Sequence, residues 1–343
     1  MDYVTLGSTG IKVNKNGFGA LPIQRVSESE AVFLLRKAWQ SGITFYDTAR
    51  DYTDSERKIG LALSDVRDDI ILATKTSAKD TKAFWEQLNT SLNTMKTGYI
   101  DIYQFHNPPF CPRPGDDSGL YDAMLEAKAQ GKVKHIGFTN HRLDIAREAA
   151  ESGLYETIQY PISYLSAPEE LGLVSACAER GIGFIAMKAL SGGLITDSAA
   201  AYAFFMKYDN VIPIWGVQRE SELDEFISYQ DTAPVMDENA KRAIERDAAE
   251  LCGDFCRGCG YCLPCPAKIH IPTAARMTLL IKRSHDSFYY SDLARDSMKR
   301  VDDCINCGHC KEHCPYGLDA PRLMREGLAD FKKLTTGVLT IDN

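Results

Sequence analysis

Short apolar runs rich in β-branched and aromatic residues recur at a steady interval along the first 230 residues. Polar and amphipathic segments of helical length separate these runs. Strands alternating with helices predict an α/β fold, and eight of them fit a closed (β/α)8 TIM barrel. An open doubly wound sheet is the alternative, but no GxGxxG follows the first run. The predicted strands lie at 16–23, 43–49, 69–76, 99–107, 133–140, 157–163, 183–190 and 211–217.

The segment 27–42 shows the helical pattern most clearly. Val32, Leu35, Ala38 and Trp39 share one face at helical spacing. Ser27 suits the N-cap, and Gly42 suits the position just beyond the C-terminus. Ahead of the first strand, residues 4–13 (VTLGSTGIKV) predict a small hairpin.

Four polar residues fall at or just beyond the ends of predicted strands. Asp47 follows ITFY, Lys75 follows IILAT, and His106 follows IDIYQF, while Tyr52 lies just beyond Asp47. Taken singly, such residues are more often helix caps, surface residues or satisfied core groups. The chemistry of a (β/α)8 barrel sits at the C-terminal ends of its strands, so together the four predict a catalytic group.

The stretches around these four residues resemble the aldo-keto reductase family. They read YDTARDYTDSERKIG, ILATKT and IDIYQFHN, and GKVKHIGFTNH, IQYPIS and VIPIWGVQRESELDE resemble later segments of the same family. The resemblance covers about residues 1–230. It implies an NAD(P)H-dependent oxidoreductase that reduces a small-molecule carbonyl, or oxidises the corresponding alcohol.

The resemblance gives each of the four residues a role. Tyr52 would supply the proton, although an unperturbed phenol has a pKa of about 10. We expect the Lys75 cation to lower that pKa, with Asp47 keeping Lys75 charged and oriented. His106 would donate a hydrogen bond to the carbonyl oxygen and stabilise its developing negative charge.

The resemblance also implies a nicotinamide cofactor site. Thr139, Asn140 and Gln159 would hold the carboxamide, and residues 188–194 (KALSGGL) would wrap the pyrophosphate, since glycines allow close backbone approach. Many family members stack an aromatic residue on the nicotinamide where this chain has Met187. The full set of expected cofactor contacts is Gly19, Thr139, Asn140, Gln159, Lys188, Leu190, Gly192, Gly216, Gln218, Arg219, Glu222 and Glu225.

The choice between NADH and NADPH turns on two residues. Relatives that prefer NADPH often place a basic residue where this chain has Glu222. A carboxylate would repel a 2′-phosphate and could accept a hydrogen bond from a bare ribose hydroxyl. Arg219 is close enough in sequence to restore phosphate binding. The pattern leans towards NADH and leaves NADPH open.

Cysteines are concentrated in the last hundred residues. Of eleven, only Cys111 and Cys177 precede residue 250. Without a secretion signal, such a concentration indicates metal rather than disulfides. We divide the chain into a barrel at 1–230, a linker and connecting helix at 231–250, and a mostly α-helical ferredoxin-like domain at 251–343.

Two four-cysteine runs, each ending in Cys-Pro, carry the iron–sulfur prediction. The second has the bacterial ferredoxin spacing, whereas the last gap of the first is one residue short. In two-cluster ferredoxins the fourth cysteine of each run ligates the other cluster. This predicts one [4Fe–4S] cluster on Cys256, Cys259, Cys262 and Cys314, and a second on Cys304, Cys307, Cys310 and Cys265. Cys252 is left over. Zinc is the competing metal, although eight thiolates in two runs exceed one zinc site.

The gap between the runs is longer than a compact ferredoxin needs, and residues 273–300 within it predict helix. The whole chain thus resembles the aldo-keto reductase subgroup that carries a C-terminal ferredoxin-like domain.

Composition sets limits on partners and location. The 343 residues carry a net charge of −8, which argues against nucleic-acid binding. The first residues, MDYVTLGSTG, show no signal-peptide pattern, and no apolar run reaches membrane-spanning length. We therefore expect a cytoplasmic protein with no membrane partner.

Hydride carriers move two electrons and iron–sulfur clusters move one, which leaves two functional hypotheses. In the first, a carbonyl reductase carries the clusters for structure or for electron transfer, with a ferredoxin or a flavoprotein as electron partner. In the second, the chain is an iron–sulfur electron-transfer component whose barrel docks a partner redox protein. A flavin would bridge the two kinds of carrier; the sequence has no signature for one and leaves its presence open.

A zinc-stabilised binding protein is a third interpretation, disfavoured by the intact catalytic residues. Substrate identity and oligomeric state are not readable from the sequence.

Overall fold

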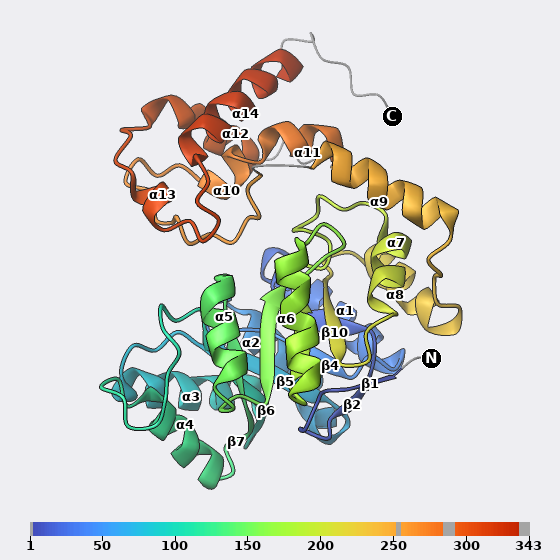
Figure 1. Ribbon diagram of the computed structural model, residues 1–343, viewed down its shortest axis with the longest axis vertical. Coiled ribbons are helices and arrows are strands. Elements are labelled where there is room, and N and C mark those ends of the chain that lie inside the picture. The colour runs from blue at the N-terminus through green and yellow to red at the C-terminus, as the bar shows by residue number, and fades with distance from the viewer. Residues whose placement is uncertain (1–2, 252–254, 284–291, 336–343) are drawn as a thin grey trace. The chain divides into compact units, whose positions relative to one another are not determined.

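The computed structural model describes residues 3–251, 255–283 and 292–335, which form two compact units. The first comprises residues 1–189 and 199–240, and the second residues 190–198 and 241–343. Cys252 and residues 284–291 of the predicted helical segment lie outside the described residues. Figure 1 shows the course of the chain through both units.

The first unit is a closed barrel of eight parallel strands in the order β10-β3-β4-β5-β6-β7-β8-β9. The predicted (β/α)8 barrel is therefore confirmed, and each strand lies within or close to its predicted run. The strands are β3 (Gly17–Gly19), β4 (Phe45–Asp47), β5 (Ile71–Thr76), β6 (Ile100–His106), β7 (Val133–Thr139), β8 (Thr157–Pro161), β9 (Gly183–Met187) and β10 (Val211–Gly216).

Helices connect the strands, as the hydrophobic pattern predicts. They are α1 (Glu28–Gln40), α2 (Ser55–Leu63), α3 (Thr81–Met95), α4 (Leu120–Ala129), α5 (Leu143–Glu151), α6 (Pro168–Glu179), α7 (Ser198–Phe205) and α8 (Glu220–Asp231).

Helix α1 begins and ends where its sequence predicts. Ser27 and Glu30 form a reciprocal capping box, and Gly42 follows the helix with φ +85°. The predicted apolar face is shifted slightly. Leu35 and Ala38 are buried with Ala31 and Leu34, whereas Val32 and Trp39 are half-buried at the margin.

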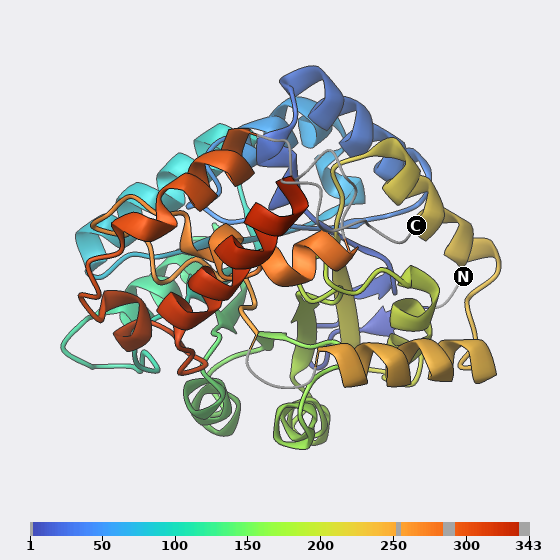
Figure 2. The ribbon, with the colours of Figure 1, turned by 90° about the horizontal axis from the view of Figure 1, so that it is seen from above.

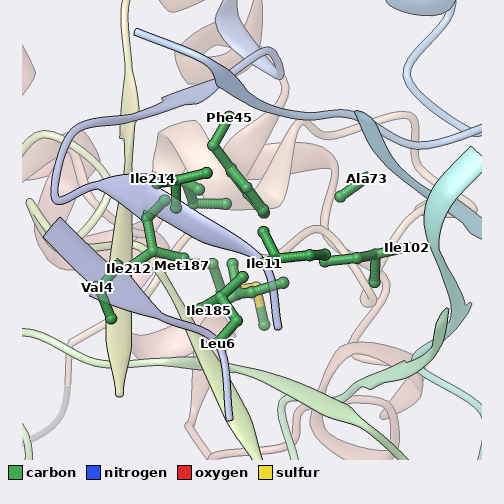
Figure 3. Close-up of a cluster of buried hydrophobic side chains, with 11 residues drawn as sticks. Val4, Leu6, Ile11, Phe45, Ala73, Ile102, Ile185, Met187, Ile212 and Ile214 are labelled. Carbon is green, nitrogen blue, oxygen red and sulfur yellow. The ribbon is translucent and has the colours of Figure 1, made fainter. Parts of the chain in front are cut away.

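An apolar layer fills the end of the barrel interior that faces the N-terminal hairpin. Side chains from β4, β5, β6, β9 and β10 meet there, and the predicted N-terminal hairpin packs against them. The hairpin pairs β1 (Tyr3–Thr5) with β2 (Lys12–Asn14) in antiparallel fashion. Figure 3 shows this cluster, which comprises Val4, Leu6, Ile11, Val13, Phe45, Ala73, Ile102, Ile185, Met187, Ile212 and Ile214. This layer fills one end of the interior and, apart from Met187 at the end of β9, leaves the carboxyl ends of the strands for polar groups.

The second unit is mostly helical. Helix α14 packs against α10 and α11, as the red and orange ribbons show in both views (Figure 1, Figure 2). A Cβ on Gly327 of α14 would lie 2.5 Å from the Ala274 carbonyl oxygen, so only glycine permits this approach. The elements are α9 (Glu238–Glu250), α10 (Ile271–Ala274), α11 (Met277–Arg283), α12 (Asp292–Lys299), η4 (Val301–Asp303), α13 (His309–Glu312) and α14 (Ala320–Thr335).

Candidate active site and cysteine loops

Strand register directs a set of polar side chains into the barrel. Side chains alternate along a strand, so a residue two positions beyond an inward-pointing one also points inward. Phe45, Ala73 and Ile102 belong to the interior cluster. Two residues further along their strands stand Asp47, Lys75 and Gln104, with His106 two positions beyond Gln104. The barrel geometry therefore stacks a polar layer above the apolar one, at the C-terminal ends of the strands.

A buried ion pair forms the centre of this layer. Lys75 Nζ donates to Asp47 Oδ1 at 2.6 Å and to the carbonyl oxygen of Thr48 at 2.6 Å. Gln104 Nε2 donates to the other carboxylate oxygen of Asp47 at 3.2 Å. Asp47 and Lys75 are 2% and 1% exposed, so a charge without a partner would be costly here. The two charges compensate each other and fix each other's position.

Tyr52 and His106 lie next to this pair. Tyr52 follows β4 in a turn closed by its own N–H, which donates to the Ala49 carbonyl oxygen at 3.0 Å. Lys75 Nζ lies 5.3 Å from the centroid of the Tyr52 ring. The His106 ring meets the Tyr52 ring edge-on, with centroids 5.9 Å apart. The structure thus brings together all four residues that the sequence singled out.

The pKa directions of Tyr52 and Lys75 bear on the role expected for Lys75. Burial raises the pKa of Tyr52 well above its ordinary value, and the negative charges of Asp47 and Asp51 raise it further. Burial lowers the pKa of Lys75, and the Asp47 carboxylate works in the opposite direction. These causes raise the pKa of the resting phenol, and the expected lowering of that pKa by Lys75 stays a prediction. The Lys75 ammonium is engaged by Asp47, and desolvation of the phenol dominates.

Three contributors to this site were missed by the sequence reasoning. Gln104 orients Asp47, the Thr48 carbonyl accepts from Lys75, and Asp51 Oδ2 lies 3.4 Å from His106 Nδ1. The sequence could have indicated Gln104, because it lies two residues before His106 on the same face of a predicted strand. Room for it depends on Gly137, where a Cβ would lie 2.7 Å from Gln104 Cγ.

The expected carboxamide residues lie on neighbouring strands. Thr139 of β7 pairs with His106 on one side and with Gln159 of β8 on the other. The Asn140 N–H donates to the Gln159 carbonyl oxygen at 3.2 Å, and Asn140 Nδ2 donates to the Pro108 carbonyl oxygen. Both amide atoms of the buried Gln159 side chain lack a hydrogen-bond partner within the described residues. A buried amide with unmet donors and an unmet acceptor suits an amide ligand.

Five other expected cofactor contacts fall into three places. Gly19 and Gly216 pair across β3 and β10, and a Cβ on Gly19 would lie 3.1 Å from the Trp215 carbonyl oxygen. Lys188 follows β9 with φ +56°. Leu190 and Gly192 lie in the 190–198 loop, which belongs to the second unit.

Glu222 works as a helix cap at the start of α8. Its Oε2 accepts from the backbone N–H groups of Gln218 at 2.9 Å and Arg219 at 3.1 Å. The Arg219 guanidinium lies 3.8 Å from the other carboxylate oxygen. Glu225 accepts from the Tyr229 hydroxyl on the same helix. A carboxylate therefore occupies N–H groups that could otherwise bind an anion.

In the second unit, four cysteines from both runs line one cavity. Cys265 of the first run lines it with Cys304, Cys307 and Cys310 of the second, and the space measures about 350 Å³ including its opening to solvent. This is the set that the interleaved ferredoxin pattern assigns to one cluster. In the first run, burial raises the pKa of Cys262 to about 12, and charges at Cys256 and Cys259 raise it too. The pairing of Cys314 with the first run stays a prediction.

The placement of the described cysteine side chains bears on the choice between zinc and a cluster. Among the described residues, no three His, Cys, Asp or Glu side chains converge closely enough to hold one metal ion. A tetrahedral zinc site would need four sulfur atoms about 2.3 Å from one point. The described cysteines show no such convergence, and the two clusters stay a prediction.

Comparison with known proteins identifies the class. The family model described as "Aldo/keto reductase family" matches residues 15–200, and one described as "4Fe-4S dicluster domain" matches residues 255–319. The first match spans more than half of the chain. The protein belongs to the aldo/keto reductase family, and it carries a C-terminal 4Fe-4S domain in the same chain.

Individual relatives agree with this assignment. The chain is 30% identical to L-galactose dehydrogenase of Arabidopsis thaliana over 211 residues, which are 56% of this chain and 66% of the relative. It is 29% identical to the aldo-keto reductase YhdN of Bacillus subtilis over 216 residues, 57% of this chain and 64% of the relative. The chain thus spans slightly less than two thirds of each of these curated relatives.

Solved structures confirm the fold. The holo form of an aldo-keto reductase from Bacillus halodurans superposes with a TM-score of 0.63 and 21% identity, covering 72% of this chain and 96% of that one. A putative aldo-keto reductase from Pseudomonas aeruginosa gives a TM-score of 0.60 at 20% identity, covering 67% and 94%. Within the described residues, no helix is long and apolar enough to cross a membrane.

Proposed function

We propose that the protein is an NAD(P)H-dependent oxidoreductase that reduces a small-molecule carbonyl, or oxidises the corresponding alcohol, with Tyr52 as proton donor. The observation that carries this proposal is the meeting of Tyr52, Lys75, Asp47 and His106 above the apolar core of the barrel. A reduced nicotinamide supplies the hydride to the carbonyl carbon, so the protein must supply a proton to the carbonyl oxygen.

The four side chains divide this work. Tyr52 stays protonated at neutral pH because burial raises its pKa, so the phenol is available as a donor. After transfer, the nearby Lys75 ammonium stabilises the tyrosinate until solvent returns a proton. Asp47 holds the ammonium in place, and His106 donates a hydrogen bond to the oxygen on which charge develops.

The residues expected to hold the cofactor fit a nicotinamide dinucleotide. Gln159 and Asn140 would bind the carboxamide, since the side-chain amide of Gln159 has no other partner among the described residues. Glu222 supports NADH over NADPH, because its carboxylate occupies the Gln218 and Arg219 N–H groups and would repel a 2′-phosphate. Residues 188–194 would wrap the pyrophosphate.

We further propose two [4Fe–4S] clusters with interleaved ligands. The cavity lined by Cys265, Cys304, Cys307 and Cys310 supports one of them. Cys256, Cys259, Cys262 and Cys314 would hold the other. The clusters serve the fold of the second unit, electron transfer, or both; a ferredoxin or flavoprotein would be the partner in the second case.

The test is anaerobic purification followed by chemical and kinetic analysis. We expect about eight iron atoms per chain, and carbonyl-dependent oxidation of NADH with a higher kcat/KM than that of NADPH. The carbonyl panel includes aldoses and sugar lactones, because one relative is named for L-galactose. Nucleotide binding without turnover by any carbonyl or alcohol would overturn the reductase proposal. Oxidation of reduced clusters by a carbonyl, without nicotinamide, would favour the electron-transfer alternative.

A further inference from the structure

The 190–198 loop has a compact backbone, although its glycine-rich sequence does not by itself favour one conformation. The N–H groups of Gly193 and Ile195 both donate to the Leu190 carbonyl oxygen, at 2.9 and 3.2 Å. Gly192 and Gly193 adopt positive φ angles of +68° and +89°. Consecutive glycines carry high conformational freedom, so contacts from outside the loop are needed to keep this shape.

Two arginines supply those contacts. Arg276 Nη2 donates to the Gly192 carbonyl oxygen at 2.6 Å, and Arg283 Nη1 donates to the Leu194 carbonyl oxygen at 2.8 Å. Both arginines belong to the second unit, as the loop does. Hydrogen bonds from a guanidinium are stronger than those between neutral groups. The loop is thus fixed at two carbonyls, one on either side of Gly193.

Arg276 also lies against the first cysteine run. A Cβ on Gly258, between Cys256 and Cys259, would come within 2.8 Å of Arg276 Nη1. A Cβ on Gly192 would lie 3.5 Å from the Arg257 carbonyl oxygen. The cysteine turn, the Arg276 guanidinium and the loop are therefore packed together, and the position of the cysteine turn constrains the loop.

Arg283 is itself held firmly. Its side chain is only 6% exposed, and it pairs with the buried Asp247 and with Glu250, both on α9. A buried, paired guanidinium has little freedom to move, so its bond to the Leu194 carbonyl is a fixed support.

We propose that Arg276 and Arg283 are positioning residues for the nucleotide, and that they hold the 190–198 loop in the shape that binds the pyrophosphate. This inference rests on the proposed function. It makes nucleotide affinity depend on an ordered first cysteine run, because Arg276 contacts both. A loop that is ordered before binding saves the cost of ordering it on binding, so affinity rises without a direct contact from either arginine.

The test compares holoprotein variants under anaerobic conditions. Arg276→Ala should weaken NADH binding about tenfold, the scale of one lost charge-assisted hydrogen bond, while kcat at saturation changes little. Arg276→Lys keeps one donor and should recover part of the affinity. Arg322→Ala is the matched control, because Arg322 is half-exposed on α14 and pairs there with Glu326; it should leave the dissociation constant unchanged. Iron content is measured in every variant. If Arg276→Ala loses iron, the NADH affinity of Arg276→Lys tests the positioning role in its place.

Hydrogen exchange of the loop's backbone amides tests whether Arg276 orders the loop, independently of the proposed function. The amides of Gly193 and Ile195 should exchange faster in Arg276→Ala than in the wild type, with no nucleotide present. Unchanged exchange would overturn the positioning role, whether or not NADH binds. An unchanged dissociation constant in a variant with faster exchange would also overturn it. If the wild type binds neither nucleotide, the proposed function fails, and the exchange result still decides whether Arg276 orders the loop.

Discussion

The barrel site and the cysteine loops are built in different ways. In the barrel, strand register places Asp47 and Lys75, and the protein alone satisfies both buried charges. In the second unit, most of the described cysteines lie on loops that turn through positive-φ glycines such as Gly258 and Gly308, while Cys310 lies on the short helix α13, and no strand register fixes them. The first site is organised by backbone geometry, whereas we expect the second to depend on its proposed clusters for cohesion. Four predictions and a final measurement test this contrast.

The largest effect is expected at Tyr52. Tyr52→Phe keeps the ring that packs against His106 and removes only the proton, so kcat for carbonyl reduction should fall about 10²–10⁴-fold. NADH affinity and iron content should be unchanged. Tyr99→Phe, which removes a hydroxyl bonded to exposed Asp68, is the control. Near-normal turnover in Tyr52→Phe would show that Tyr52 is not the proton donor.

A smaller effect is expected at Gln104, which contacts Asp47 but not Tyr52. Gln104→Met preserves the unbranched shape that fits beside Gly137 and removes the hydrogen bond to Asp47. We expect kcat to drop about tenfold through a less firmly held Lys75, with little change in nucleotide affinity. Steady-state kinetics beside an exposed control, Gln130→Met, checks this. A change in KM alone would contradict the positioning role.

The interleaved ligand set predicts a twofold effect on iron. Cys265→Ala should remove the cluster of the second run and leave about four of about eight iron atoms. Its residual spectrum should match that of Cys304→Ala and differ from that of Cys259→Ala. Cys177→Ala, at a buried thiol of α6, should keep all the iron. A Cys265→Ala spectrum like that of Cys259→Ala would instead assign each cluster to a single run.

The smallest effect concerns the resting Tyr52 phenol. Because burial raises its pKa, Tyr52 should give no tyrosinate absorbance until the pH passes about 10. The measurement is the ultraviolet titration difference between the wild type and Tyr52→Phe. Ionisation below that pH would support the expectation that Lys75 lowers the pKa of the phenol.

The same contrast explains what the sequence could predict. Short apolar runs alternating with helical segments, together with the positions where those runs end, were enough to anticipate the barrel and to select Asp47, Lys75 and His106, because parallel register brings successive strand ends together. Cysteine spacing was enough to indicate a 4Fe-4S domain. Arg276 and Arg283 could not be selected, since their partners are carbonyls about 85 to 90 residues away, brought close only by tertiary packing. The direction of the Tyr52 pKa shift could not be predicted, because the sequence shows neighbouring charges but not burial.

The central claim is that the barrel transfers hydride directly, without passing electrons through the clusters. The most direct test uses NADH deuterated at the transferable position of the nicotinamide, with a carbonyl substrate found in the screen and the holoprotein in ordinary water. The account predicts that deuterium appears on the carbinol carbon of the alcohol product, in proportion to the NADH consumed. An alcohol without deuterium there would mean that the electrons travelled separately from the hydrogen, and would contradict the account.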